Sequence, residues 1–147
     1  MTAPSAPSRL STELAAALKA AGLRWVPASG DQFVLPDRDL DHLVFVLSDM
    51  TVDVQDVPSG RVIGFNGTVE WALDSVEIDE ALWLPREDAL RELLGEAFRS
   101  LRRTSDGYAV TAETSDGVAR VGVAASAVDA YARALLAVGV PPARPGG

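Results

Sequence analysis

The stretch Arg61-Val62-Ile63-Gly64-Phe65-Asn66-Gly67-Thr68-Val69-Glu70-Trp71-Ala72-Leu73 decides the fold class. Asn66 and Gly67 both tolerate the positive φ angles that a tight two-residue hairpin turn requires. After this turn every second residue from Val69 to Leu73 is apolar, which is the alternation of a strand with one face toward a core. The stretch therefore predicts two antiparallel strands joined by a turn at Asn66-Gly67.

Further strands are predicted on the N-terminal side of this hairpin. Residues 43–47 (Leu-Val-Phe-Val-Leu) are all apolar, so we expect a central strand that is covered on both faces. Residues 52–57 alternate in part, and Pro58-Ser59-Gly60 forms a turn signal between them and the hairpin. Together these segments predict an antiparallel β-meander at about residues 43–73. A brief strand at 33–35 is expected to precede it.

Three helices are predicted outside the meander. The first runs from about Arg9 to Ala21, with Ser8 as its N-cap and Gly22 as its stop. The second runs from about Pro85 to Leu101, and its buried side is predicted to include Leu90, Leu94 and Leu101, among others. The third lies between a Ser126 cap and Gly139.

Two shorter patterns complete the predicted elements. Asp74 and Glu77 have the spacing of a capping box, so a short helical turn or loop is expected between Asp74 and Leu84. Residues 108–113 and 118–123 predict a second, C-terminal hairpin around Ser115-Asp116-Gly117.

The order of these elements predicts an α+β fold: an antiparallel β-meander at about residues 43–73 and a C-terminal hairpin, packed with three helices. Strands and helices do not alternate as βαβ units, which argues against a parallel sheet. We expect one domain over residues 9–140. Residues 1–8 and 141–147 are rich in Pro, Gly, Ser and Ala and are predicted to be disordered tails.

The composition restricts the classes of function. The chain has 147 residues and no cysteine, so disulfides, thiolate catalysis and cysteine-based metal sites are excluded. The first residues carry neither the basic nor the apolar region of a signal peptide, and no window is apolar enough for a membrane span. We therefore expect a soluble, cytoplasmic protein.

Negative charge is concentrated in the middle of the chain. The net charge is −8, but residues 37–88 hold 13 acidic residues against three arginines, which is −10 for that segment. Such a segment repels nucleic acid and anionic lipid and attracts cations or a basic partner. A solvated acidic surface that only keeps the protein soluble would have the same composition.

Sequence motifs of catalysis are not found. The chain has no phosphate-binding loop, dinucleotide fingerprint, zinc-protease motif or nucleophile elbow. His42 is the only histidine, and no serine near it in sequence is marked as a nucleophile. Asp37, Asp39 and Asp41 alternate like the start of a calcium loop, but the glycine and glutamate that such a loop needs are missing. We therefore predict no catalytic residue, no metal ligand and no cofactor.

Five residues after the meander form the predicted partner-binding site: Asp74, Glu77, Asp79, Glu80 and Trp83. The four carboxylates would attract a partner protein with a basic surface, and Trp83 would add apolar contact. The alternative is a small-ligand or divalent-cation site in which Glu70 or Asp74 lies beside a tryptophan, with carboxylate-based enzymatic activity. Tryptophans of a small domain more often fill its core.

A further pattern is formed by the block from Leu47-Ser48-Asp49-Met50 through Gly60-Arg61-Val62-Ile63-Gly64 to Trp83-Leu84-Pro85-Arg86-Glu87, together with Ala130-Tyr131-Ala132-Arg133. On these residues the chain resembles a family of short actinobacterial proteins that often carry the name pilus assembly protein CpaE. The resemblance implies a role near a pilus or secretion apparatus. The chain does not have the phosphate-binding loop of the longer ATPases that share the name, so the resemblance implies no ATPase activity.

Overall fold

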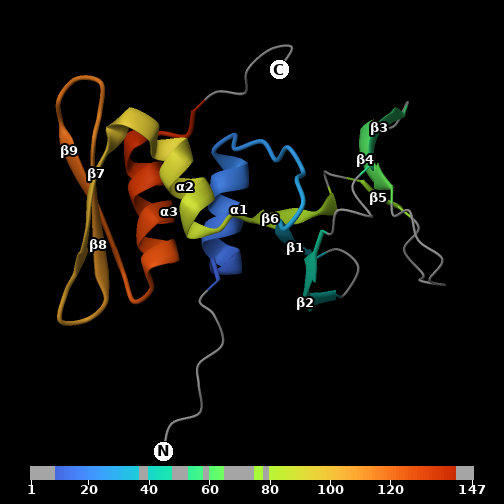
Figure 1. The fold of residues 1–147 in the computed structure, drawn as a ribbon, viewed down its shortest axis with the longest axis horizontal. Helices are drawn as coiled ribbons and strands as arrows, with labels where there is room; N and C mark the ends of the chain where they lie inside the picture. Colours follow the sequence, from blue (N-terminus) through green and yellow to red (C-terminus); the bar gives the residue numbers. More distant parts are fainter. Residues whose placement is uncertain are drawn as a thin grey trace, which may run out of the picture. The chain divides into compact units, whose positions relative to one another are not determined.

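The computed structural model describes residues 9–36, 40–47, 53–57, 60–64, 75–77 and 80–141. Its elements are α1 (Thr12–Ala20), β1 (Gln32–Leu35), β2 (Leu40–Val46), β3 (Asp53–Val57), β4 (Gly60–Gly64), β5 (Ser75–Glu77), β6 (Leu82–Leu84), α2 (Glu87–Leu94), the 3-10 turn η3 (Gly95–Ala97), β7 (Phe98–Arg103), β8 (Tyr108–Glu113), β9 (Ala119–Ala124) and α3 (Ala127–Val138). Figure 1 shows these helices and strands. In the described part of the chain all strand pairings are antiparallel, so the predicted α+β class is confirmed. The predicted tails lie outside the described residues except for residue 141.

The chain divides into two compact units. One, called here the terminal unit, comprises Met1–Arg24 and Pro85–Gly147. The other, the middle unit, comprises Trp25–Leu84. The single domain over residues 9–140 stays a prediction, and each unit is described by itself.

In the terminal unit, α1 begins where a serine caps it. Ser11 has extended backbone angles, and its side chain accepts a hydrogen bond from the Leu14 backbone N–H at 3.4 Å. The Ser11 N–H in turn donates to the Asp129 carboxylate at the start of α3, at 3.0 Å. The predicted start, with Ser8 as cap, is wrong by three residues, because the contact with α3 and the cap both fall on Ser11.

The end of α1 is confirmed. Gly22 has a φ of +105°, and the Leu23 N–H donates to the Leu18 carbonyl at 2.9 Å. This bond and the one from Gly22 to the Lys19 carbonyl form the Schellman motif that a glycine stop favours.

Helix α2 is much shorter than predicted. It ends at Leu94, where Gly95 has a φ of +54°, and Phe98–Arg103 is the strand β7 rather than the end of a helix. Phe98 stacks on Tyr131 of α3 with ring centroids 5.8 Å apart. Leu101 was predicted to be buried and is 40% exposed. The helical spacing of the leucines was misleading because pairing with β8 and packing on Tyr131 determine the conformation of this segment.

Strands β7, β8 and β9 form a meander with α3 on one face, and the other helices of the unit lie on the same side of the sheet (Figure 1). The C-terminal hairpin and the third helix are confirmed: Ser126 accepts a bond from the Asp129 N–H at 3.2 Å, and Gly139 ends α3. Gly122 of β9 pairs with Val110 and lies directly beneath α3. A Cβ at this position would overlap the Ala130 carbonyl oxygen and the Ala134 backbone nitrogen.

The middle unit contains two three-stranded sheets, in the orders β2-β1-β6 and β3-β4-β5. Among the described strands β2 lies at an edge of its sheet, and Val46 is 60% exposed, so the prediction of a central strand covered on both faces is wrong. Phe45 packs against the core cluster, whereas Val46 faces away from it. The meander lies at β3-β4-β5 over 53–77, whereas β2 pairs with β1.

The conformation of residues 75–77 contradicts a second prediction. They form β5, with Glu77 opposite Val62 of β4, so the capping box at Asp74 and Glu77 does not start a helix. Pairing with β4 outweighs the local capping pattern here, and Val76 favours a strand. The turn at Asn66-Gly67 lies outside the described residues.

Candidate interaction surface

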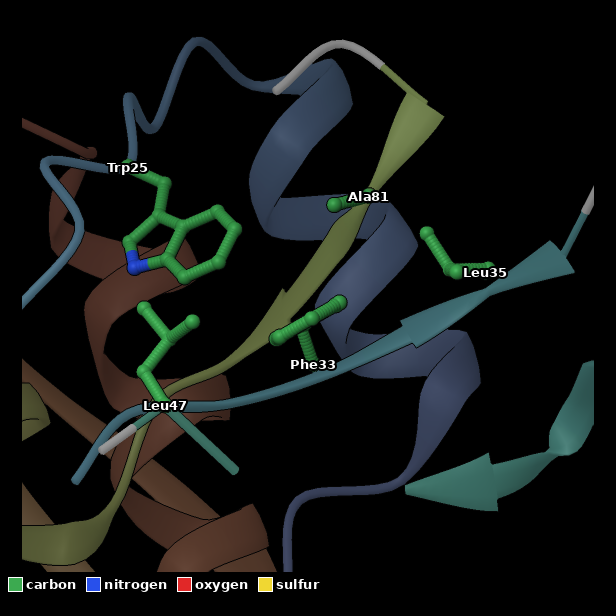
Figure 2. Close-up of a cluster of buried hydrophobic side chains, with 5 residues drawn as sticks. All are labelled: Trp25, Phe33, Leu35, Leu47 and Ala81. Atoms are coloured by element: carbon green, nitrogen blue, oxygen red, sulfur yellow. The ribbon is translucent and has the colours of Figure 1, made fainter. Parts of the chain in front are cut away.

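Aromatic rings line one face of the sheet β2-β1-β6. Phe33 is opposite Phe45 on one side and Trp83 on the other, and Trp25 packs over them. The ring centroids of Trp25 and Trp83 lie 6.3 Å apart, with an interplanar angle of 12°. The ring centroids of Trp25 and Phe33 lie 5.4 Å apart. Figure 2 shows Trp25, Phe33 and Ala81 in this cluster with Leu35 and Leu47.

The prediction that tryptophans fill the core is confirmed for Trp25, which is 5% exposed. Trp83 packs against the same cluster but is only half-buried. It can therefore hold its ring against the cluster and still present part of it to a partner, as anchor residues of interfaces do. Trp71 lies outside the described residues.

Asp31 fixes the loop that carries Trp25. Its Oδ2 atom accepts a hydrogen bond from Trp25 Nε1 at 2.8 Å and another from the Ala28 backbone N–H at 3.0 Å. Its backbone carbonyl accepts from the Leu47 N–H at 2.9 Å, which joins the loop to the chain after β2. Asp31 is not among the predicted site residues. Its place after Ala28-Ser29-Gly30 is a turn signal that could have indicated it.

Replacing Asp31 with alanine is expected to lower the stability of the middle unit by about 1–3 kcal/mol, because the Trp25 indole N–H and the Ala28 N–H both lose a charged acceptor. Urea unfolding followed by tryptophan fluorescence measures the change. Asp116→Ala, at an exposed turn, is the matched control. Equal midpoints for the two variants would contradict the role of Asp31.

The structure describes three of the five predicted site residues. Glu77 is the last residue of β5, Glu80 is half-buried just before β6, and Trp83 lies in β6. Asp74 and Asp79 lie outside the described residues. Glu80 and Trp83 are thus carried by one short segment, and the grouping of all five stays a prediction.

The division into units coincides with a division of charge. The middle unit, Trp25–Leu84, contains 12 acidic residues and 2 arginines, a net charge of −10. The terminal unit contains 9 acidic and 11 basic residues, a net charge of +2. A unit this strongly negative produces a field that extends beyond its own surface.

The alternative function requires side chains that are grouped around a cation or a small ligand. Among the described residues, no three His, Asp or Glu side chains are grouped closely enough to hold a metal ion. Asp41 and His42 are in β2, and Asp37 and Asp39 lie outside the described residues. Among the described residues outside 40–43 and the strands β3, β4 and β5, no charged side chain is buried. None of the helices in the described part of the chain has the length and hydropathy of a membrane span.

Comparison of the chain with protein-family models, with curated proteins and with solved structures finds no match.

Proposed function

We propose that the protein is a cytoplasmic, non-enzymatic interaction domain whose middle unit docks the basic surface of a partner protein. The observation that carries the proposal is the charge of −10 on Trp25–Leu84 against +2 on the rest of the chain. Asp74, Glu77, Asp79 and Glu80 supply charge at the contact, and Trp83 supplies the apolar anchor. The resemblance to the short pilus-assembly family suggests a partner in a pilus or secretion apparatus.

The physical basis of this docking is electrostatic. A strongly acidic surface raises the association rate with a basic partner and opposes acidic ones, while the buried contacts determine how long the complex lasts. Screening shortens the range of the field from about 10 Å at 0.1 M salt to about 3 Å at 1 M salt. Binding should therefore weaken steeply as the salt concentration rises.

A triple charge reversal tests the proposal. We expect Asp74→Lys, Glu77→Lys and Glu80→Lys together to weaken binding at least about 100-fold, since close charge pairs at interfaces couple by about 1.5 kcal/mol or more. The partner is first identified by crosslinking and mass spectrometry on a native lysate. Its affinity for each variant is then measured with purified proteins between 0.05 and about 0.5 M salt.

The matched control reverses three exposed carboxylates of the terminal unit: Glu92→Lys, Glu96→Lys and Asp106→Lys. It changes the net charge of the chain by the same amount but leaves the middle unit unaltered. We expect it to keep affinity within about threefold of the parent, as for charges outside an interface. An equal loss of affinity for both triple variants, or an affinity that does not change with salt concentration, would contradict the proposal.

A further inference from the structure

The two edges of the sheet β7-β8-β9 differ in charge. β7 carries Arg99, Arg102 and Arg103, all exposed, and no acidic residue. Charged side chains of this kind keep an edge strand from pairing with another chain. β9 has six residues with Arg120 as its only charge, and Val121 and Val123 are 54% and 50% exposed. Of the two edges, β9 carries fewer charges and therefore has less of this protection.

In β9 the backbone N–H and C=O groups of every second residue point toward the open edge of the sheet. The Thr114 N–H donates to the Val118 carbonyl at 2.8 Å, so this pair is a hydrogen-bonded pair of the β8-β9 ladder. In an antiparallel ladder hydrogen-bonded pairs alternate with pairs that are not hydrogen-bonded. The pairs that Arg120 and Gly122 form with Ala112 and Val110 of β8 are therefore hydrogen-bonded too. The N–H and C=O groups of Ala119, Val121 and Val123 therefore point away from β8.

The side chains of β9 differ between its two faces. Gly122 and Arg120 are on the α3 face, so Val121 and Val123 are on the opposite, open face of the sheet. A strand paired to β9 would place residues beside the two valines on that open face. On the α3 face it would need a small residue beside Gly122, and Arg120 would favour an acidic residue opposite to it.

The position of α3 determines what kind of strand fits. Its backbone lies directly on Gly122. Paired strands are about 4.8 Å apart, whereas packed helices need about 8–10 Å between their axes. A second copy pairing through its own β9 would bring its own α3 too close to the first. An extended peptide segment with no helix over it does not have this conflict.

We propose that the open edge of β9 binds an extended segment of a partner protein as an added antiparallel strand. The segment has apolar, β-branched residues at alternate positions, which lie beside Val121 and Val123, and an acidic residue opposite Arg120. The main-chain groups of Ala119, Val121 and Val123 supply the hydrogen bonds, and the side chains supply specificity. This site is in the terminal unit and does not depend on docking by the acidic middle unit.

The test uses the full chain and a fluorescent, end-blocked peptide, Thr-Val-Ser-Val-Glu-Val-Thr, with binding measured by fluorescence anisotropy. N-methylation of the three valines removes the N–H groups that would face β9, and we expect it to weaken binding at least about tenfold, at roughly 0.5–1.5 kcal/mol for each hydrogen bond. N-methylation of the serine and glutamate, whose N–H groups face away, is the matched control and should change binding by less than about twofold.

Protein variants locate the site. Val121→Pro removes an outward N–H without breaking the β8-β9 ladder and should also weaken binding at least about tenfold. Arg120→Glu should prefer a peptide in which lysine replaces glutamate, reversing the preference of the parent.

Three results would overturn the proposal: no binding at about 1 mM peptide, equal effects of the two N-methylated peptides, or dimerisation of the chain that Val121→Pro abolishes. The N-methylated peptides need no protein variant, so the test does not depend on Val121→Pro folding.

Discussion

Replacing Gly122 with valine is expected to destabilise the terminal unit by about 3 kcal/mol, the upper part of the range for overpacked cores. The added Cβ would overlap the Ala130 carbonyl oxygen and the Ala134 backbone nitrogen. These are backbone atoms, so the strain cannot be relieved by a side-chain rotation. Helix α3 would have to move off the sheet, and it carries Tyr131 and Leu135, which are 1% and 0% exposed.

Urea unfolding monitored by far-UV circular dichroism measures this change. Ala119→Val is the matched control, because Ala119 is an exposed residue of the same strand on the face away from α3. We expect the control to stay within about 0.5 kcal/mol of the parent. A loss of less than about 1 kcal/mol for Gly122→Val would contradict the close contact between α3 and β9.

Replacing Trp25 with alanine should cost the middle unit about 3–5 kcal/mol, as for other large aromatic residues removed from a core. Trp25 is 5% exposed, stacks on Trp83 and packs against Phe33 with its ring tilted by 40°. The change also leaves the Asp31 carboxylate without its indole donor. Hydrogen exchange of the β1 and β6 amides reports the loss, because these strands carry Phe33 and Trp83.

Trp25→Phe separates packing from hydrogen bonding. It keeps an aromatic ring against Phe33 but removes the indole N–H and part of the ring area, so we expect a smaller loss, of about 1–2 kcal/mol. If Trp25→Ala and Trp25→Phe had the same effect, the cluster would not depend on the packing of this ring.

The elements that the sequence predicted well are those with local signals at their ends. α3 has a serine cap and a glycine stop, and both hold in the structure. The C-terminal hairpin has Gly117, with a φ of +84°, in its turn. These interactions involve residues a few positions apart, so a single sequence contains the information needed to predict them.

The wrong predictions concern segments whose conformation depends on distant residues. Phe98–Arg103 has helical spacing of its apolar residues, but its partners are β8 and Tyr131. Ser75–Glu77 follows a capping pattern, but it pairs with β4. The edge position of β2 likewise depends on which strands lie next to β1. The spacing of apolar residues along the sequence does not indicate these long-range contacts.

The candidate site was predictable in part. Counting charges along the chain indicated the acidic segment at 37–88, and tryptophan size indicated a core role for Trp25. The boundaries of the middle unit at Trp25 and Leu84 depend on which residues contact one another in three dimensions. For Asp31 the sequence offers only the turn residues before it, because its bond to Trp25 Nε1 depends on the loop conformation.

Hydrogen–deuterium exchange with and without the purified basic partner is the most direct test of docking by the middle unit. The proposal predicts that the partner slows exchange within Trp25–Leu84, most of all around Glu77, Glu80 and Trp83. Slowed exchange confined to Pro85–Val138, with the middle unit unchanged, would contradict it.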